Sequence, residues 1–173
     1  MKNIAVIILS SIILFSFTDK KVKKGNDAEK ISDYTNVALN IIGHVENTSF
    51  DFKIARYRLY RDNKFVSGGN TDRFGTMELF LMKNSHYLLE LSAPGFISKK
   101  IYINTFVPGS FKSIGNFDFG VSLVPKDILS DEDFCALDVP YAVVYFNEEN
   151  GEFDYDRKYT EEMVKIEEEI ISY

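Results

Sequence analysis

The chain has 173 residues, enough for one domain with tails but too few for two full-sized cores. Hydrophobic residues make up 45% of it and charged residues 27%, a balance that supports a buried core and argues against disorder. Its 20 Lys and Arg stand against 26 Asp and Glu, so the formal net charge is −6, which argues against general binding to a phosphate backbone. We expect no nucleic acid among its partners.

The aromatic composition favours β-strands. There are 15 Phe and 10 Tyr but no Trp, and flat aromatic side chains pack well on a pleated surface. Cys135 is the only cysteine, so no disulfide can form within the chain. We expect its side chain to be a small buried hydrophobe rather than a nucleophile.

Residues 1–18 have the pattern of a secretory signal peptide. Lys2 gives a positive start, and residues 4–17 form an apolar run interrupted only by Ser. The run is shorter than the roughly 20 apolar residues that span a hydrocarbon core. We therefore expect cleavage after Thr18 and export to the periplasm or the cell surface. An uncleaved membrane anchor is the alternative.

Residues 19–36 are polar and Lys-rich without a sustained period, and they are predicted to be a linker. Between residues 37 and 125, apolar and polar residues alternate as in strands with one buried face. Turn residues such as Asp62, Asn63 and Gly75 interrupt this alternation about every ten residues. We predict seven strands, at residues 37–46, 55–60, 65–70, 77–81, 87–91, 97–103 and 117–123. The pattern predicts an all-β fold, a seven-stranded antiparallel β-sandwich.

Residues 126–173 are predicted to form an acidic C-terminal extension. Residues 141–146 favour an eighth strand, and residues 147–151 favour a turn. Apolar residues then recur at helical spacing, which predicts a C-terminal amphipathic helix of about three to four turns. They are Tyr159, Met163, Ile166, Ile170 and Tyr173. This stripe must bury against the chain's own sandwich, which we favour, or against another protein.

Four segments between Leu39 and Val124 follow the order of a known family. They are Ile41-x-Gly43-x-Val45, Tyr57-x-Leu59-Tyr60, Thr71-Asp72-x-x-Gly75-x-Met77-x-Leu79 and Tyr87-x-Leu89-x-Leu91-x-Ala93-x-Gly95-Phe96. In this order they resemble the carboxypeptidase regulatory-like domain of exported bacterial proteins. Residues 139–156 resemble an extension of such domains in Bacteroidetes-type envelope proteins. The resemblance implies a transthyretin-like (prealbumin-like) or immunoglobulin-like sandwich. It also implies a non-catalytic envelope module without the peptidase for which the family is named.

No residue pattern favours catalysis or a cofactor. The two histidines, His44 and His86, lack the spacing of a metal motif, and there is no G-x-S-x-G nucleophile motif. Acidic residues concentrate in the extension but miss the spacing of a calcium loop, so we expect a solvated acidic surface. The alternative is a small exported hydrolase in which tail carboxylates such as Asp154 and Asp156 perform acid–base work.

We therefore predict a non-catalytic exported module that mediates protein or glycan interaction in the bacterial envelope, without cofactor or metal. Its partner would be an envelope protein, a peptide or a glycan. Contact with the membrane would occur only through an uncleaved N-terminal segment, as in a membrane-tethered accessory subunit of an envelope complex. Outward strand aromatics and the helical stripe are the candidate interaction residues. They are Tyr60, Phe80, Tyr102, Tyr159, Met163, Ile166 and Ile170.

Overall fold

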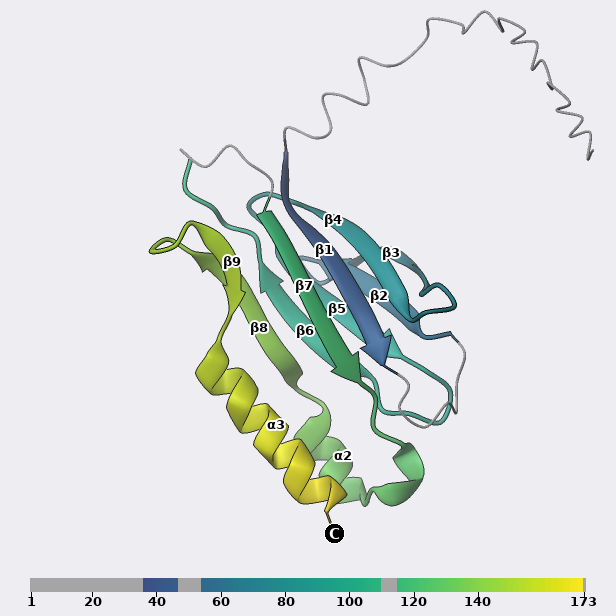
Figure 1. Cartoon of the computed structure of the whole chain (residues 1–173). Coiled ribbons are helices and arrows are strands. Elements are labelled where there is room, and N and C mark those ends of the chain that lie inside the picture. The colour runs from purple at the N-terminus through teal and green to yellow at the C-terminus, as the bar shows by residue number, and fades with distance from the viewer. Residues whose placement is uncertain (1–35, 47–53, 110–114, 173) are drawn as a thin grey trace, which may run out of the picture.

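The computed structural model of the chain describes residues 36–46, 54–109 and 115–172. The predicted signal peptide and residues 19–35 of the predicted linker lie outside these ranges. Within them, nine strands form two sheets (Figure 1). Two short helices follow the last strand of the smaller sheet, and a longer helix follows the last strand of the chain. The mostly β architecture predicted from the alternation is confirmed.

The smaller sheet, called sheet A, has the strand order β4-β1-β7. Its central strand β1 pairs antiparallel with β4 and parallel with β7. The bounds are Val37–Glu46 for β1, Thr76–Met82 for β4 and Gly115–Ser122 for β7.

The larger sheet, called sheet B, has the strand order β3-β2-β5-β6-β8-β9. Its neighbours pair antiparallel except for β6 and β8, which are parallel. The bounds are Arg56–Arg61 for β2, Lys64–Asn70 for β3, His86–Ser92 for β5, Lys99–Asn104 for β6, Pro140–Asn147 for β8 and Glu152–Tyr155 for β9.

Seven strands, β1 to β7, lie between residues 37 and 125, as predicted. The described chain nevertheless has nine strands, because β8 and β9 join sheet B. It is also not purely antiparallel, since β1 with β7 and β6 with β8 form parallel pairs. Alternation shows which face of a strand is buried, but it is the same for either strand direction. The direction depends on the crossovers: after β6 the chain enters sheet A as β7 and then returns to sheet B as β8.

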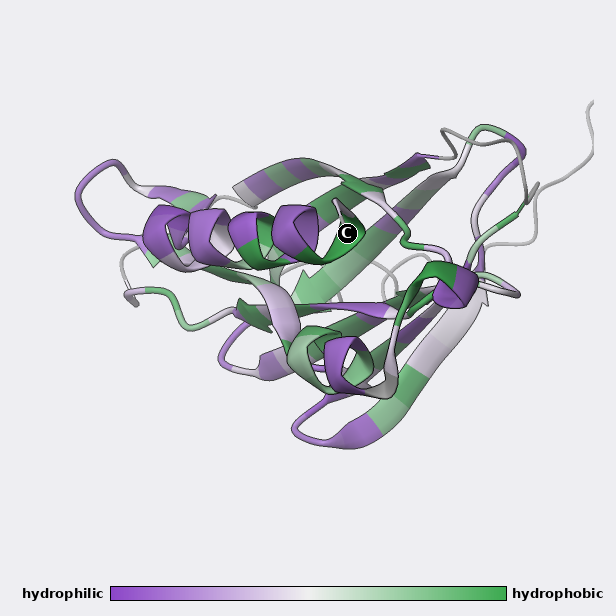
Figure 2. Ribbon diagram, turned by 90° about the horizontal axis from the view of Figure 1, so that it is seen from below, coloured by the Kyte–Doolittle hydropathy of each residue, from purple (hydrophilic) through white to green (hydrophobic). Residues whose placement is uncertain are grey.

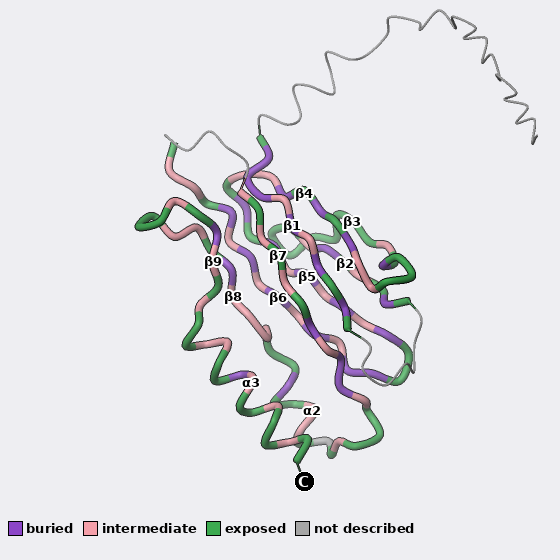
Figure 3. Tube along the Cα trace, in the orientation of Figure 1, coloured by how far each residue is buried: buried purple, intermediate pink, exposed green. Residues whose placement is uncertain are grey.

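The inner faces of the two sheets share one hydrophobic core. Hydrophobic and hydrophilic residues alternate along strands in Figure 2, and Figure 3 shows buried positions alternating with more exposed ones along the strands. Both sheets contribute fully buried side chains, namely Leu39, Ile41, Leu81, Leu89, Leu91, Ile103 and Val144. Burying one apolar side chain of this size stabilises the folded state by about 1.5–3 kcal/mol. This shared layer therefore holds the sheets together.

Two turns have the backbone conformations that their residues predict. Asp62 and Asn63, between β2 and β3, have φ angles of 48° and 62°, the left-handed conformation of a tight hairpin turn. Before β4, the Asp72 carboxylate accepts hydrogen bonds from two nearby backbone amides, and Gly75 has a φ angle of 80°. A Cβ atom at residue 75 would collide with the Val45 carbonyl oxygen, so glycine is required there.

The predicted C-terminal helix is present as α3, Arg157–Ile171. Asp156 caps it by accepting a hydrogen bond from the Tyr159 amide. Its apolar side packs against β8 and α2, while its polar side faces outward (Figure 2). Met163 is buried, and the Tyr159 hydroxyl donates a hydrogen bond to the Pro140 carbonyl. The helix therefore docks on its own chain. No helix within the described residues is long and apolar enough to cross a membrane.

Two short helices lie where the sequence predicts none. The 3-10 helix η1 spans Lys126–Ile128, and α2 spans Asp131–Leu137, with a capping box formed by Ser130. Helices of this length contain too few turns to show a period in the sequence. Cys135 lies on α2 and is exposed, so the expected buried position is wrong.

Candidate functional site

A row of apolar side chains crosses the outer face of sheet B. In the register of the sheet, Tyr60 of β2 lies opposite Phe65 of β3 and Leu88 of β5. Leu88 lies opposite Tyr102 of β6, which lies opposite Val143 of β8. These five residues, called the aromatic row, follow one line across five neighbouring strands.

The aromatic row faces away from the core because its sequence neighbours face inward. Leu59, Leu89 and Ile103 each adjoin a member of the row and are buried, and successive strand residues point to opposite faces. Phe65 is 61% exposed, and its ring packs edge-to-face with that of Tyr60 at a centroid distance of 5.9 Å. The other members are partly exposed. The row is therefore an accessible apolar surface.

A hollow of about 330 Å³ adjoins the row. The Tyr102 hydroxyl lies 2.6 Å from His86 Nδ1, and the two rings stack with centroids 5.7 Å apart. The His86 amide donates a hydrogen bond to the Asp62 carboxylate, which attaches the β2–β3 turn to β5. The lining is Asp62, Asn63, His86, Tyr87, Leu88 and Tyr102. Polar groups and rings thus border one concavity, an arrangement suited to receiving a partner's side chain.

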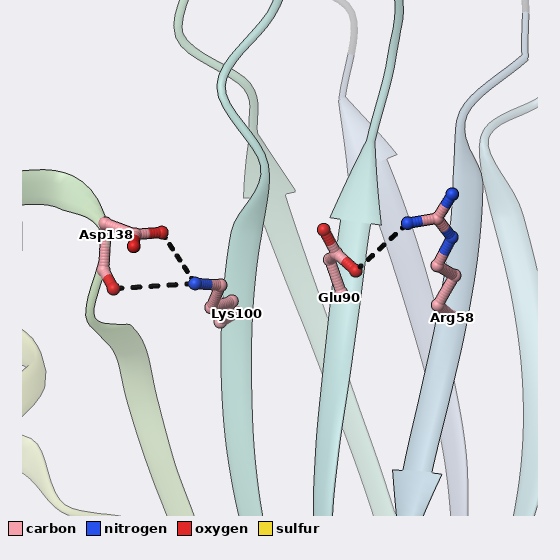
Figure 4. Close-up of polar contacts among 4 residues, drawn as sticks. All are labelled: Arg58, Glu90, Lys100 and Asp138. Atoms are coloured by element: carbon pink, nitrogen blue, oxygen red, sulfur yellow. Dashed lines mark hydrogen bonds and ion pairs between the residues drawn. The ribbon is translucent and has the colours of Figure 1, made fainter. Parts of the chain in front are cut away.

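A row of charged side chains, shown in Figure 4, crosses three of the strands that carry the aromatic row. Arg58, Glu90 and Lys100 lie opposite one another, each two residues from a member of the aromatic row. Arg58 pairs with Glu90 at 3.8 Å, and Lys100 pairs with Asp138 at 2.6 Å. Exposed ion pairs contribute little to folding stability. Their position instead gives the apolar surface a charged border.

The structure brings two of the predicted interaction residues together, since Tyr60 and Tyr102 both belong to the aromatic row. Phe80 is 50% exposed, but it belongs to β4 and lies on the outer face of sheet A. Sequence analysis did not select Phe65 or Leu88, although Leu88 falls in the outward phase of its strand. Knowing the phase of a strand does not show which strands share a sheet, so the row could not be assembled from the pattern.

The four predicted helical residues lie in two environments. Tyr159 and Met163 contact the chain's own fold, as described above. Ile166 is 38% exposed and Ile170 is partly exposed. Much of this stripe therefore attaches α3 to sheet B and is not free for a partner.

A buried ion pair also attaches α3 to sheet B. Lys99, the first residue of β6, points inward in the same phase as Ile101, and its side chain is only 6% exposed. Its Nζ lies 2.6 Å from the Glu167 carboxylate and 4.0 Å from the centroid of the Tyr141 ring. Burial lowers the pKa of Lys99, an effect that the hydrogen bond and charge of Glu167 oppose. Burial, and then the charges of Glu167 and Glu168, raise the pKa of Tyr141 to about 12.

The two carboxylates considered for acid–base work have partners within the fold. Asp156 caps α3. Asp154 lies 3.8 Å from the Arg157 guanidinium, and its carboxylate accepts a hydrogen bond from the Tyr155 amide. In the part of the chain that the structure describes, no group of three or more His, Cys, Asp or Glu is arranged to hold a metal ion.

No protein-family model matches the chain, and no curated protein matches its sequence. The resemblance to the carboxypeptidase regulatory-like domain therefore depends on the four quoted segments alone. A function must be inferred from the geometry of the surface.

Proposed function

We propose that the chain is an exported, non-catalytic module of the bacterial envelope that binds a partner protein through the outer face of sheet B. The observation that carries this proposal is the aromatic row, which crosses five strands beside a hollow of about 330 Å³. Aromatic residues are enriched at protein interfaces, and a contiguous exposed apolar patch is a feature of interaction sites.

In this proposal, the two sheets form a transthyretin-like sandwich of the carboxypeptidase regulatory-like kind. The quoted segments support it by their placement, since they fall on β1, on β2, on β4 with its preceding turn, and on β5 with its following turn. The signal pattern of residues 1–18 supports export. The extension widens sheet B by two strands and so enlarges the face that carries the aromatic row.

The composition of this face favours a protein over a glycan as the partner. Tyr and Arg are the side chains that most often dominate the binding energy of protein interfaces, and both are present in Tyr60, Tyr102 and Arg58. An apolar centre with a charged border is the usual anatomy of such interfaces. The hollow lined by Tyr102 and His86 offers a pocket for an inserted side chain.

Site-specific photo-cross-linking in the native host tests the proposal. A photoreactive residue is placed at Leu88, in the middle of the aromatic row, or at Phe80, an exposed position on sheet A that serves as the matched control. We expect a cross-linked protein from position 88 and none from position 80. Equal yields at both positions, or no product at position 88, would contradict the proposal.

Binding of the purified partner is then compared among variants. The double variant Tyr60→Ser/Tyr102→Ser should bind at least about tenfold more weakly, because losing a central aromatic residue often costs about 2 kcal/mol or more. Phe80→Ser should bind like the wild type. Circular dichroism verifies that both variants are folded. Unchanged binding by the double variant, or binding of isolated envelope glycans in place of any protein, would rule out this role.

A further inference from the structure

The two sheets differ in width, and this leaves one edge of sheet A open. Sheet A has three strands and sheet B has six, and β7 is the outermost strand of sheet A. Figure 1 shows β8, β9 and α3 extending past β7 on that side. Among the described residues, no strand pairs with the outer edge of β7. An unpaired edge presents backbone N–H and C=O groups to an additional strand.

A groove of about 330 Å³, called the β7 groove, lies along this edge. Five consecutive residues of β7, residues 117–121, line it. Because successive strand residues point to opposite faces, five in a row can border one groove only if the groove follows the backbone edge. Ala142 and Val144 of β8 and Thr160 and Val164 of α3 line its other sides. The groove is therefore a slot between β7 and α3.

Polar groups in the slot lack partners within the described residues. The outer edge of β7 has no strand partner, and the buried Thr160 hydroxyl makes no hydrogen bond there. Buried polar groups in folded proteins are nearly always hydrogen-bonded. An extended peptide backbone supplies donors and acceptors along a strand edge and is the ligand that such edges bind in β-augmentation.

The apolar lining of the slot is incompletely covered. Phe117 and Phe119 pack against the core with ring centroids 6.3 Å apart, yet both remain partly exposed. Alternate residues of an added strand would point toward these rings, and apolar side chains there would remove them from water.

The charges around the groove indicate which residues should alternate with the apolar ones in the ligand. The strands of sheet A contain Glu46, Glu78 and Asp118 but neither Lys nor Arg. Asp118 lines the β7 groove and is exposed. On the opposite side, α3 contains five Glu and three basic residues. Side chains of the ligand that point outward beside Asp118 should therefore be basic.

We propose that the β7 groove binds an extended segment of another protein, with apolar residues alternating with basic ones, as a fourth strand of sheet A. The segment pairs with the backbone of residues 117–121, inserts its apolar side chains over Phe117 and Phe119, and places its basic ones near Asp118. This site is separate from the aromatic row, which lies on sheet B, and it is a second binding function of the module.

The test uses a capped peptide of about seven alternating Lys and Val residues, the length of an ordinary strand. Titration into the isotopically labelled protein should shift the backbone amide resonances of residues 117–121 and of the α3 residues Thr160 and Val164. A peptide of alternating Glu and Val is the charge control. Two further peptides are N-methylated on every Val or on every Lys. Because the amides of successive residues point to opposite edges of a strand, one of the two peptides loses the ladder hydrogen bonds to β7 and should not bind.

Charge-reversal variants test whether the peptide binds beside Asp118 rather than elsewhere on the protein. Asp118→Lys should weaken binding of the Lys/Val peptide about tenfold and should strengthen binding of the Glu/Val peptide. Glu78→Lys changes an exposed carboxylate on β4, two strands away from the groove, and is the matched control; it should weaken binding much less than Asp118→Lys does. Tyr60→Ser/Tyr102→Ser should leave the affinity unchanged, so that this site and the aromatic row fail or succeed independently.

Three results would overturn the inference. The first is the absence of shifts in β7 at peptide concentrations up to about 1 mM, which corresponds to a binding free energy weaker than about −4 kcal/mol. The second is a set of shifts centred on β4 or on the aromatic row. The third is concentration-dependent dimerisation through β7 without peptide, since a second copy would then be the occupant.

Discussion

Sheets A and B share one core but differ on their outer faces. The strands of sheet A contain three carboxylates and neither Lys nor Arg. The strands of sheet B contain six basic residues and three carboxylates. Arg58, Glu90 and Lys100 lie on its outer face, whereas Lys99 points inward and is buried. The inner faces must be apolar to bury a common layer, so they are alike. The outer faces are free of this requirement, and their difference is therefore the feature to examine for partners.

The edges of the two sheets differ as well. At one edge of sheet B, β3 begins with Lys64, contains Gly68 and Gly69, and pairs with β2 through an irregular register. Charges, glycines and bulges of this kind discourage the addition of another strand. The strand β7, residues 115–122, includes Gly115, Gly120 and Asp118, but it contains no Lys or Pro, and its pairing with β1 has a regular register. An edge with a regular register and without Lys or Pro is the one expected to accept a strand.

The strongest test of the shared core is truncation at the centre of each sheet. Leu39 in sheet A and Leu89 in sheet B are both fully buried. Leu39→Ala and Leu89→Ala should each lower the free energy of unfolding by about 2–5 kcal/mol, because each leaves a cavity in the same layer. Leu88→Ala, on the outer face, should cost less than about 1 kcal/mol.

Urea denaturation followed by circular dichroism and by tyrosine fluorescence measures these effects. Both probes should report the same single transition in each variant, because the sheets fold as one unit. Two separated transitions, with each substitution shifting only one of them, would show that the sheets are independent.

The second prediction concerns the buried ion pair between sheet B and α3. Lys99→Met should lower the free energy of unfolding by about 3 kcal/mol, because it leaves the Glu167 carboxylate buried without its cation. The double variant Lys99→Met/Glu167→Leu should recover most of that loss, because no unpaired charge remains. Thermal or urea unfolding of the four proteins of the cycle provides the measurement. A double variant no more stable than the single one would show that packing rather than charge is responsible.

Much of the fold was predictable because alternation is a local property. Strands between residues 37 and 125, the left-handed turn at Asp62 and Asn63, and the C-terminal helix all follow from short sequence windows. The pairing of β1 with β7 and of β6 with β8 was not predictable, since it depends on crossovers between the sheets. The strand β9 has only four residues and offers too short a pattern to assign.

The candidate site was predictable only in part for the same reason. Outward phases identified Tyr60 and Tyr102, but also Phe80, because the phase is the same whichever sheet a strand joins. Lys99 carried a visible signal, a basic residue in the apolar phase of its strand. Its partner Glu167 is 68 residues away in the chain, a contact that no local pattern reveals.

The pH dependence of stability tests the environment of Lys99 and Tyr141, where α3 packs on sheet B. The pKa of Tyr141 is raised to about 12, so the folded state keeps the phenolic proton at pH values where the unfolded state has lost it. Stability from this group is therefore lost as the pH rises from about 10 to about 12, by at most about 1.4 kcal/mol per pH unit and by less because the ring is partly exposed. The pKa of Lys99 is lowered, so this residue has the opposite sign and favours folding as the pH approaches 10.5.

The variant Tyr141→Phe separates the effect of the Tyr141 phenol on stability from that of the Lys99 ammonium. Between about pH 9 and pH 11, the variant should lose about 1 kcal/mol less stability than the wild type, because only its phenol titration is removed. Urea unfolding at a series of pH values measures the difference, and the tyrosinate absorbance of the folded proteins should show one fewer group titrating near pH 12. Identical pH profiles for the two proteins would show that Tyr141 is not perturbed.

The smallest effect is expected at the charged row of sheet B. Arg58 is 47% exposed and lies 3.8 Å from the Glu90 carboxylate, so Arg58→Ala should change the free energy of unfolding by no more than about 0.5 kcal/mol, and moderate salt should erase the change. The same substitution should weaken binding of the partner protein severalfold, because a border arginine contributes to an interface more than to the fold. Glu78→Ala on sheet A provides the comparison, since it should alter neither quantity appreciably. A stability loss from Arg58→Ala as large as its binding loss would assign the charged row to the fold, and the contrast between the outer faces of the two sheets would then carry no information about a partner.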